Sequence, residues 1–267
     1  MTWHLSNVNL KGEDMTVALR DRTVIIQRSI ETGARHPLHY FDSRTYVQHN
    51  LALGDGLGPL LEFLDSIPSG SATVTPHRAF QDGSVSFAHL EYVLPGYGHV
   101  VGFEVHRWHE DRIVEHWDNL QPFPDVPSVN GRSVVDGDRE ILDRDLTADN
   151  KRRVREFAET VLIGRGHERL PSYVKPDVAQ HNPSHGDGLA EFAAFLASET
   201  EPLEFVRSHH LFGEGNFVLL ISEGRTAHQQ LALYNLFRLD NGLIAEHWDV
   251  VEPIPERSAW RNKNGKF

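Results

Sequence analysis

The sequence contains no cysteine, which excludes disulfide bonds, thiolate catalysis and cysteine-ligated zinc. Basic residues are outnumbered: 26 Lys and Arg stand against 38 Asp and Glu, and the formal net charge of −12 argues against a general binder of nucleic acid or anionic membranes. Long apolar runs are also missing, since stretches such as residues 217–221 are far too short to cross a membrane. We therefore expect a globular chain with neither nucleic acid nor a membrane as its partner.

The first residues do not have the pattern of a signal peptide. Residues 1–21 carry Lys11, Glu13 and Asp14 and contain no apolar core segment. The absence of cysteine is compatible with a reducing cytosol. We expect a cytoplasmic protein on these grounds.

Two rare strings occur twice, in the same order. The sequence Ile-Val-Glu-His-Trp-Asp at 113–118 returns as Ile-Ala-Glu-His-Trp-Asp at 244–249, and Gln-His-Asn at 48–50 returns at 180–182. The separations are 131 residues from His116 to His247 and 132 residues from His49 to His181. A repeat of this length is a whole domain, so the chain is a tandem duplication, and 267 residues accommodate two domains of ordinary size.

Each half shows helical periodicity first and strand alternation afterwards. In the second half a helix is expected over residues 150–162, followed by a short helix before Pro176. Four strands are expected in each half, over residues 73–80, 84–94, 100–108 and 113–120, and over residues 203–212, 216–223, 229–239 and 243–251. This order predicts α+β domains in which helices pack on a curved antiparallel sheet and leave a conical cavity. The expected divisions are an N-terminal arm (1–22), domain 1 (23–124), a linker (125–148) and domain 2 (149–267).

The order of motifs resembles a known family. Helices, Gln-His-Asn, a Gly-x-Gly bend, a second helix and strands ending in Glu-His-Trp-Asp resemble the SnoaL-like branch of the nuclear transport factor 2-like superfamily, over roughly residues 23–124 and 150–255. The linker at 130–137 and the tail at 257–267 are similar to those of tandem members of the group. The resemblance implies two cone-shaped, cystatin-like domains with the fold of polyketide cyclases and ketosteroid isomerases, which form a pseudo-dimer within one chain. Whether further homo-oligomers form is left open.

The resemblance also implies a chemistry. In SnoaL-like cyclases an acid on the strand before the last hairpin removes a proton alpha to a carbonyl group, and an intramolecular aldol closure follows. The family pattern Asp-x-Phe-Arg reads Glu104-Val-His-Arg in the first half and Asn235-Leu-Phe-Arg in the second. An amide cannot act as a base near neutral pH, so we place the chemistry in the first half. No cofactor is implied.

Strand alternation places Glu104 and His106 on one face and Arg107 on the other. Glu104 is the predicted base, with His106 or His49 as its orienting or electrophilic partner. The alternative is that Glu104 pairs with Arg107 on a solvated sheet. Histidines in the two Gln-His-Asn strings either line the mouth of the cavity or satisfy a turn. The predicted substrate-binding residues are Asn50, Phe87, Phe103 and Trp117 in the first half, and His181, Asn182, Asn235 and Trp248 in the second.

The Glu-His-Trp-Asp strings have two faces. Alternation puts Glu115 and Trp117 on one face and His116 and Asp118 on the other, and either face can point at the cavity. We favour His116 and Asp118 at the interface between the domains, with Trp117 and Trp248 as cavity walls. The 17 histidines do not form a metal-binding motif such as His-Glu-x-x-His, so no metal is expected.

Two functions follow from these observations. The first is a SnoaL-like enzyme that acts on a small, apolar carbonyl compound by general-base proton abstraction, giving aldol cyclisation or isomerisation. The second is a non-catalytic module that binds a small molecule in a degenerate active site, which the replacement of the acid by Asn235 favours for the second half.

Overall fold

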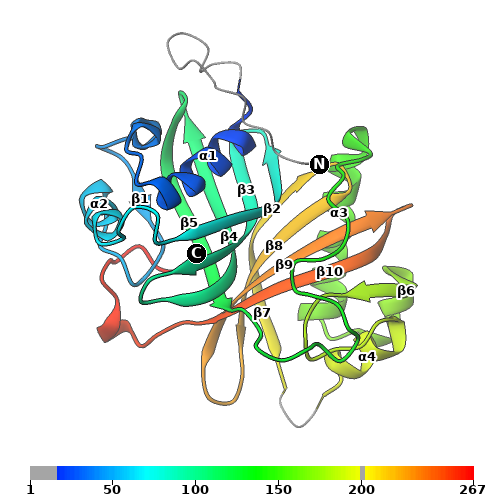
Figure 1. Cartoon of the computed structure of the whole chain (residues 1–267). Coiled ribbons are helices and arrows are strands. Elements are labelled where there is room, and N and C mark those ends of the chain that lie inside the picture. The colour runs from blue at the N-terminus through cyan, green and yellow to red at the C-terminus, as the bar shows by residue number, and fades with distance from the viewer. Residues whose placement is uncertain (1–16, 199–201) are drawn as a thin grey trace.

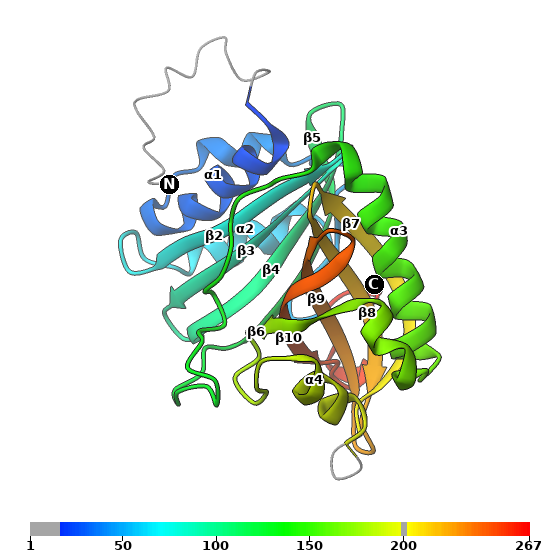
Figure 2. The ribbon, with the colours of Figure 1, turned by 90° about the vertical axis from the view of Figure 1, so that its right-hand side faces the viewer.

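The computed structural model describes residues 17–198 and 202–267, which form two domains of the same construction (Figure 1). Each domain has one five-stranded sheet, in the order β1-β5-β4-β3-β2 in domain 1 and β6-β10-β9-β8-β7 in domain 2. The helices lie on the outer sides of the molecule and the two sheets lie between them (Figures 1 and 2). The predicted α+β tandem is confirmed. Most of the predicted N-terminal arm, residues 1–16, lies outside the described residues.

The elements of domain 1 begin with two helical segments and end with a four-stranded antiparallel meander. They are α1 (Leu19–Thr32), a 3-10 helix (His36–Tyr40), β1 (Val47–Gln48), α2 (Leu57–Asp65), β2 (Thr73–Asp82), β3 (Val85–Leu94), β4 (Gly98–His109) and β5 (Arg112–Pro122). The arm expected up to residue 22 therefore overlaps the first four residues of α1.

Domain 2 repeats this order. Its elements are a 3-10 helix (Arg144–Leu146), α3 (Thr147–Phe157), a π-helical turn (Ala158–Ile163), a 3-10 helix (His167–Ser172), β6 (Val174–Gln180), α4 (Leu189–Leu196), β7 (Glu204–Glu214), β8 (Phe217–Arg225), β9 (Gln230–Asp240) and β10 (Leu243–Pro253). A last 3-10 helix, Arg257–Ala259, follows. Among the described residues, no helix is both long and apolar enough to span a membrane.

The sheets are mixed and not purely antiparallel as the sequence predicted. The short strands β1 and β6 pair in parallel with β5 and β10, so that Gln48 lies beside His116 and Gln180 beside His247. Pro176 and Asp177 interrupt the apolar alternation of β6, which is why the sequence pattern indicated a helix and a turn there. The two Gln-His-Asn strings therefore begin on edge strands next to the Glu-His-Trp-Asp strands.

Helix α1 covers the concave face of the first sheet and ends where the chain needs a left-handed residue. Thr23, Ile26 and Gln27 are buried at the spacing of one helix face. Gly33, at φ +68°, terminates the helix, a conformation that glycine adopts without steric cost. This packing brings the polar side chains of Thr23 and Gln27 over the middle of the sheet.

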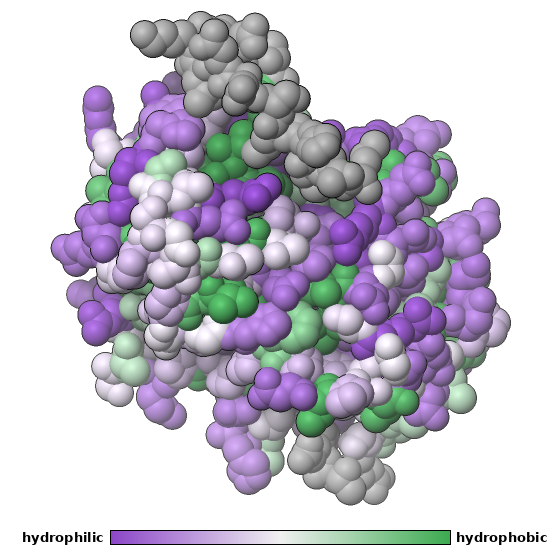
Figure 3. Space-filling model, viewed as in Figure 1, coloured by the Kyte–Doolittle hydropathy of each residue, from purple (hydrophilic) through white to green (hydrophobic). Residues whose placement is uncertain are grey.

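The convex faces of the two sheets pack against each other. The shared core consists of large apolar side chains from both domains: Phe80, Val85, Phe87, Phe103, Val105 and Trp117 from the first, and Phe217, Leu219, Ile221, Tyr234, Leu236 and Trp248 from the second. Figure 3 shows a surface on which polar residues predominate and apolar residues occur in small separate patches. The large apolar sheet faces are thus used between the two domains of one chain.

Candidate active site

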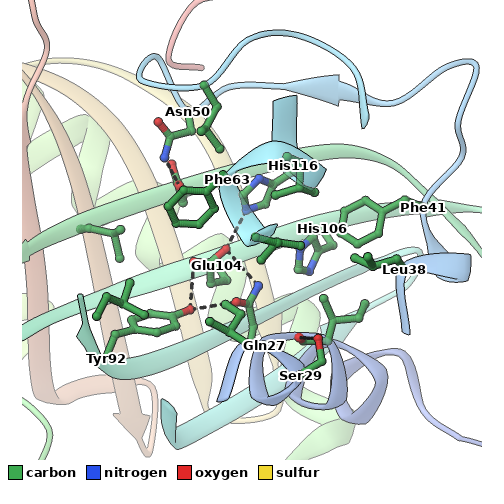
Figure 4. A pocket seen from close by; sticks show the side chains of 18 of the residues that line it. Gln27, Ser29, Leu38, Phe41, Asn50, Phe63, Tyr92, Glu104, His106 and His116 are labelled. Atoms are coloured by element: carbon green, nitrogen blue, oxygen red, sulfur yellow. Dashed lines mark hydrogen bonds and ion pairs between the residues drawn. The ribbon is translucent and has the colours of Figure 1, made fainter. Parts of the chain in front are cut away.

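Domain 1 contains a cavity between α1, α2 and the concave face of its sheet (Figure 4). It has a volume of about 100 Å³, enough for several water molecules. Apolar side chains form most of the wall: Ile26, Ile30, Leu38, Phe41, Leu53, Leu60, Phe63, Leu64, Leu94 and Leu120. Polar groups gather at one place on the wall, where Gln27, Asn50, Tyr92, Glu104, His106, His116 and Asp118 meet.

Glu104 lies at the centre of this polar group and is 6% exposed. Its Oε2 lies 2.6 Å from His116 Nε2 and accepts a hydrogen bond from Gln27 Nε2 at 3.2 Å, while Oε1 accepts one from the Tyr92 hydroxyl at 2.9 Å (Figure 4). Burial raises the pKa of Glu104, the hydrogen bond with His116 opposes that rise, and the charge of Asp118 adds to it. The net effect is a pKa above that of an ordinary glutamate, with burial as the largest cause.

The tautomer of His116 follows from Gln48. The Gln48 amide is oriented by two hydrogen bonds: Oε1 accepts from Asn50 N and Nε2 donates to the Tyr46 hydroxyl, each at 2.9 Å. Gln48 Oε1 also lies 2.9 Å from His116 Nδ1, so Nδ1 must donate. One proton then lies between His116 Nε2 and Glu104. Burial alone would lower the pKa of His116, but the hydrogen bond and charge of Glu104 outweigh it and raise that pKa.

A chain of hydroxyl groups orients His106 from the other side. Trp108 Nε1 donates to Ser86 Oγ at 2.7 Å, Ser86 Oγ lies 2.7 Å from Thr23 Oγ1, and Thr23 Oγ1 lies 3.1 Å from His106 Nδ1. Each hydroxyl hydrogen has an acceptor when the chain runs from Ser86 to Thr23 to Nδ1. This assignment puts the ring proton of His106 on Nε2, for which the described residues offer no hydrogen-bond partner. Burial and the nearby His116 lower the pKa of His106 well below its usual range, so the ring is neutral.

A second polar pair completes the cavity wall. Asn50 Nδ2 donates to Asp118 Oδ2 at 2.5 Å, and Asp118 is 4% exposed. Antiparallel pairing of β4 with β5 explains why these groups meet, since Glu104 is opposite Asp118 and His106 is opposite His116. The rings of His106 and His116 are stacked, with centroids 4.9 Å apart.

Some of the site residues that the sequence predicted for the first half lie at the cavity, and others do not. Glu104, His106 and Asn50 lie on the cavity wall. His49 does not: its ring stacks on Trp117, Nε2 lies 2.9 Å from Glu115, and Nδ1 lies 2.9 Å from the carbonyl oxygen of Gly265. This corrects its prediction as a partner of the base, because alternation along the chain turns His49 to the side opposite Gln48.

The predicted aromatic walls lie on the wrong side of the sheet. Phe87, Phe103 and Trp117 belong to the core between the domains, and the cavity is lined instead by His116 and Asp118. The favoured assignment of the two faces of the Glu-His-Trp-Asp string is thereby reversed. A β-bulge between Arg107 and Trp108 shifts the register at the end of this hairpin, and the sequence alone does not show which face is concave.

The residues predicted to bind substrate in domain 2 do not form a comparable site. His181 stacks on Trp248 at the domain interface, with centroids 4.5 Å apart, and Asn235 is hydrogen-bonded to His247 at 3.0 Å. Asn182 bonds Asp249, as Asn50 bonds Asp118. The space that corresponds to the cavity is filled by a cluster of aromatic rings, Phe157, Phe192 and Phe237. The prediction of substrate contacts in domain 2 is corrected accordingly.

Four residues of the polar group on the cavity wall were absent from the predicted site: Gln27, Tyr92, His116 and Asp118. His116 and Asp118 had a usable signal, because pairing the two predicted strands across their turn places them opposite His106 and Glu104. Gln27 and Tyr92 belong to no motif. Only the packing of α1 on β3 brings them to the carboxylate.

Glu104, His106 and His116 are also the described residues that come closest to a metal-binding group, since one ligand atom from each lies within 4.8 Å of the others. Two ligands of one zinc ion, bound at about 2.0–2.2 Å, stand roughly 3 Å or more apart. His116 Nε2 and Glu104 Oε2 are 2.6 Å apart. The spacing of this pair is that of a shared proton.

Comparison with known proteins supports the fold. Residues 154–247 match the family model of the SnoaL-like domain. Among solved structures the chain is similar to an LEH-like epoxide hydrolase from M. tuberculosis, with 17% identity and a TM-score of 0.34 over 40% of this chain and 84% of that chain. A SnoaL-like polyketide cyclase from Agrobacterium tumefaciens str. C58 has 13% identity and a TM-score of 0.34 over 39% and 91% of the two chains.

A third similar structure is a steroid delta-isomerase from Pseudomonas aeruginosa, with 21% identity and a TM-score of 0.34 over 42% of this chain and 85% of that chain. Curated proteins gave no match. The second half of the chain thus matches the SnoaL-like domain that the resemblance predicted, and the first half has the same sheet order.

Proposed function

We propose that domain 1 is an enzyme that removes a proton from a carbon atom next to a carbonyl group, with Glu104 as the base. The observation that carries this proposal is the pair formed by Glu104 and His116, which shares one proton at 2.6 Å inside an apolar cavity. A buried carboxyl with a raised pKa is a stronger base than an exposed one and is suited to weakly acidic C–H groups.

The reaction begins with Glu104 ionised and His116 protonated. Tyr92 and Gln27 each donate to the carboxylate and hold it in one orientation. Glu104 takes the proton from the substrate carbon, and the electron pair of the C–H bond moves onto the carbonyl oxygen to give an enolate. The proton then returns to a different carbon in an isomerisation, or the enolate carbon attacks a second carbonyl group in an aldol closure.

His106 is the group that stabilises the enolate oxygen. Its ring is neutral and its Nε2–H lies on the cavity wall without a protein partner among the described residues. A neutral imidazole is a good hydrogen-bond donor to an enolate, because the pKa values of the two groups are better matched than with an imidazolium. Glu104 then acts on the carbon next to the carbonyl group, and His106 acts on the carbonyl oxygen of the same substrate.

The wall of the cavity restricts the substrate to uncharged compounds. It presents two carboxyl groups, Glu104 and Asp118, and no Lys or Arg among its lining residues. A substrate phosphate or carboxylate would be buried without a partner and repelled. The substrate we propose is small and largely apolar, with an enolisable ketone as its reactive group, and the reaction needs no cofactor.

A binding module is the second candidate function. The observation in its favour is domain 2, in which the acid is replaced by Asn235 and the cavity is filled, so the fold is kept there without the base. If domain 1 is also a binding module, the same uncharged apolar compounds bind and leave unchanged.

Deuterium exchange separates the two functions. A panel of β-diketones and cyclic ketones is incubated in heavy water with the wild type, with Glu104→Gln and with Asn235→Asp, a matched change at the equivalent position of domain 2. Exchange that is accelerated by the wild type and by Asn235→Asp, and falls about 10²- to 10⁴-fold in Glu104→Gln, supports the base. Binding of a panel member without accelerated exchange supports the module.

A further inference from the structure

The linker and the last residues of the sequence make equivalent contacts with the two domains. Residues 129–135 and residues 261–267 are separated by 132 positions, the spacing of His49 and His181. Each leaves its own domain and docks on the other: Val129 N donates to Pro183 O, and Arg261 N donates to Leu51 O at 2.9 Å. In Figure 1 the last segment runs back from β10 to the loop beside α2. We call residues 261–267 the clasp.

The clasp holds the loop that follows β1. Asn262 Nδ2 donates to the carbonyl oxygens of Asn50 and Leu53, at 2.8 and 2.9 Å, and Asn264 Nδ2 donates to that of Gln48 at 2.9 Å. The carbonyl oxygen of Gly265 meets His49 Nδ1 at 2.9 Å. The backbone carbonyl groups of Gln48 and Asn50 and the side chain of His49 are therefore held by residues more than 200 positions away.

That loop carries two side chains that hold residues of the proposed site in place. Gln48 sets the tautomer of His116, and Asn50 binds Asp118 on the cavity wall. A displacement of the loop would release both side chains from these partners. The clasp thus acts on Glu104 through two intermediate residues, and it touches no substrate.

Lys266 gives the clasp an electrostatic role as well. Its side chain is 3% exposed, and Nζ lies 2.8 Å from Glu252 Oε2 on β10 and 3.6 Å from Asp118 Oδ1 on β5. Val134 occupies the equivalent position of the linker. Lys266 therefore has no counterpart at that position of the linker, and beside the Glu104–His116 pair it balances Asp118, the second carboxyl of the cavity.

We infer that the clasp is part of the domain 1 site, with Lys266 as a positioning residue, and that domain 2 serves to deliver it. This inference rests on the proposed function of Glu104. It accounts for a second domain that keeps the fold and its contacts with the first while its own cavity is filled.

Removal of the Lys266 charge has a defined electrostatic consequence. The titratable groups that interact with Asp118 and Lys266 come from six elements or loops: Tyr46 before β1, Tyr92 on β3, Glu104 on β4, His116 on β5, Tyr234 on β9 and Glu252 on β10. Lys266 lowers the pKa of His116 through its charge, whereas Glu104 and Asp118 raise it. Loss of the cation leaves the carboxylates unopposed, so both His116 and Glu104 should hold their protons to higher pH.

The test is an NMR titration of the His116 imidazole in full-length protein, which requires no substrate. Lys266→Met should raise the pKa of His116 by about half a unit to one unit, and Lys266→Arg should restore the wild-type value. The matched control is Lys263→Met, which removes the same charge from an exposed position of the clasp and should change nothing. Because Lys266→Met leaves the half-buried Glu252 carboxylate without its cation, Lys266→Met/Glu252→Gln is measured beside it.

The exchange assay separates this inference from the proposed function. In Lys266→Met the acid limb of the exchange rate should move to higher pH with little change in KM. An unchanged pKa of His116 in both Lys266→Met and Lys266→Met/Glu252→Gln overturns the inference, even if Glu104→Gln is inactive. A shifted titration in a protein without exchange activity leaves the clasp in place and overturns the chemistry.

Discussion

The two domains of this chain are repeats of one structure, but within the described residues only domain 1 has the polar cavity. The positions at which they differ distinguish the residues that maintain the fold from those proposed for the chemistry. Both domains keep a histidine bonded to a glutamine and an asparagine bonded to an aspartate. Apart from this histidine, Glu104 and the side chains around it in domain 1 are replaced in domain 2. The corresponding pairs are Thr23 and Val154, Gln27 and Ala158, Tyr92 and Gly224, Glu104 and Asn235, and His106 and Phe237.

The shared groups therefore have a structural role in both domains, and His116 has a second role only where a carboxylate lies beside it. His116 and His247 each join the parallel edge strand to the meander through a glutamine, whether or not a carboxylate is near. The repeated strings that made the duplication visible mark this frame. The proposed chemistry lies where the copies differ, and in domain 2 three of these positions hold the apolar residues Val154, Ala158 and Phe237, which are part of its core.

The largest effect is expected from reopening the second cavity. Phe192 is buried against Phe157 and stacks on His247, whereas its counterpart Leu60 lines the open cavity of domain 1. Phe192→Ala should lower the free energy of unfolding by about 3–5 kcal/mol. Leu60→Ala should lower it by less than about 2 kcal/mol, because the space beside Leu60 in domain 1 is already partly empty. Urea denaturation measures both. Equal losses would show that the two cavities are packed alike.

The next effect comes from giving domain 1 the residue of domain 2. His106→Phe should reduce the rate of deuterium exchange about 10²- to 10³-fold, because the enolate oxygen loses its donor. The converse change, Phe237→His, alters domain 2 only and should leave exchange as it is. A wild-type rate in His106→Phe would exclude His106 as the donor.

Replacement of the two equivalent aspartates by asparagine should change the stability of the protein in opposite directions. Burial raises the pKa of Asp249 to about 6, and it has no lysine at the position of Lys266. Because its unfolded value is near 3.8, the stability present at low pH is lost as the pH rises from about 3.8 to 6. Asp249→Asn should therefore stabilise the protein by about 1–3 kcal/mol near pH 8.

Asp118→Asn is the matched change in domain 1, and it should destabilise the protein at the same pH, since Lys266 loses one of its two carboxylates. Unfolding by urea at several pH values gives both results. If both changes stabilise, the lysine does not balance Asp118.

The smallest effect is a pair of opposite titration shifts. Burial lowers the pKa of His247 to about 3, while Glu104 raises that of His116 above its usual range. His247 therefore costs stability as the pH falls from about 6.5 to 3, whereas His116 adds stability below about 6.5 that is lost as the pH rises through its folded pKa. Glu104→Gln should bring the pKa of His116 below 6.5, and Asn235→Glu should raise that of His247. Two-dimensional NMR of the imidazole nitrogens resolves the pair, and unaltered values would show that burial alone sets them.

Much of the fold was accessible from the sequence, because it depends on patterns that are local or repeated. The duplication followed from two strings at nearly one spacing, and the antiparallel meanders followed from alternation and turn residues. Glu104 was identifiable as the candidate base because it keeps a carboxyl group where the family motif has its acid, whereas the second half has Asn235 there. The parallel strand β6 was missed, since Pro176 and Asp177 hide its alternation.

Alternation along a strand also told which residues share a face, but not which face is concave. The concave face is determined by the packing of α1 on one side of the sheet and of domain 2 on the other. This packing places Trp117 at the interface and His116 in the cavity. Tertiary structure alone also brought Gln27 and Tyr92 to Glu104 and Lys266 to Asp118. Contacts between residues this far apart depend on the packing of whole elements, which leaves no periodic signal in the chain.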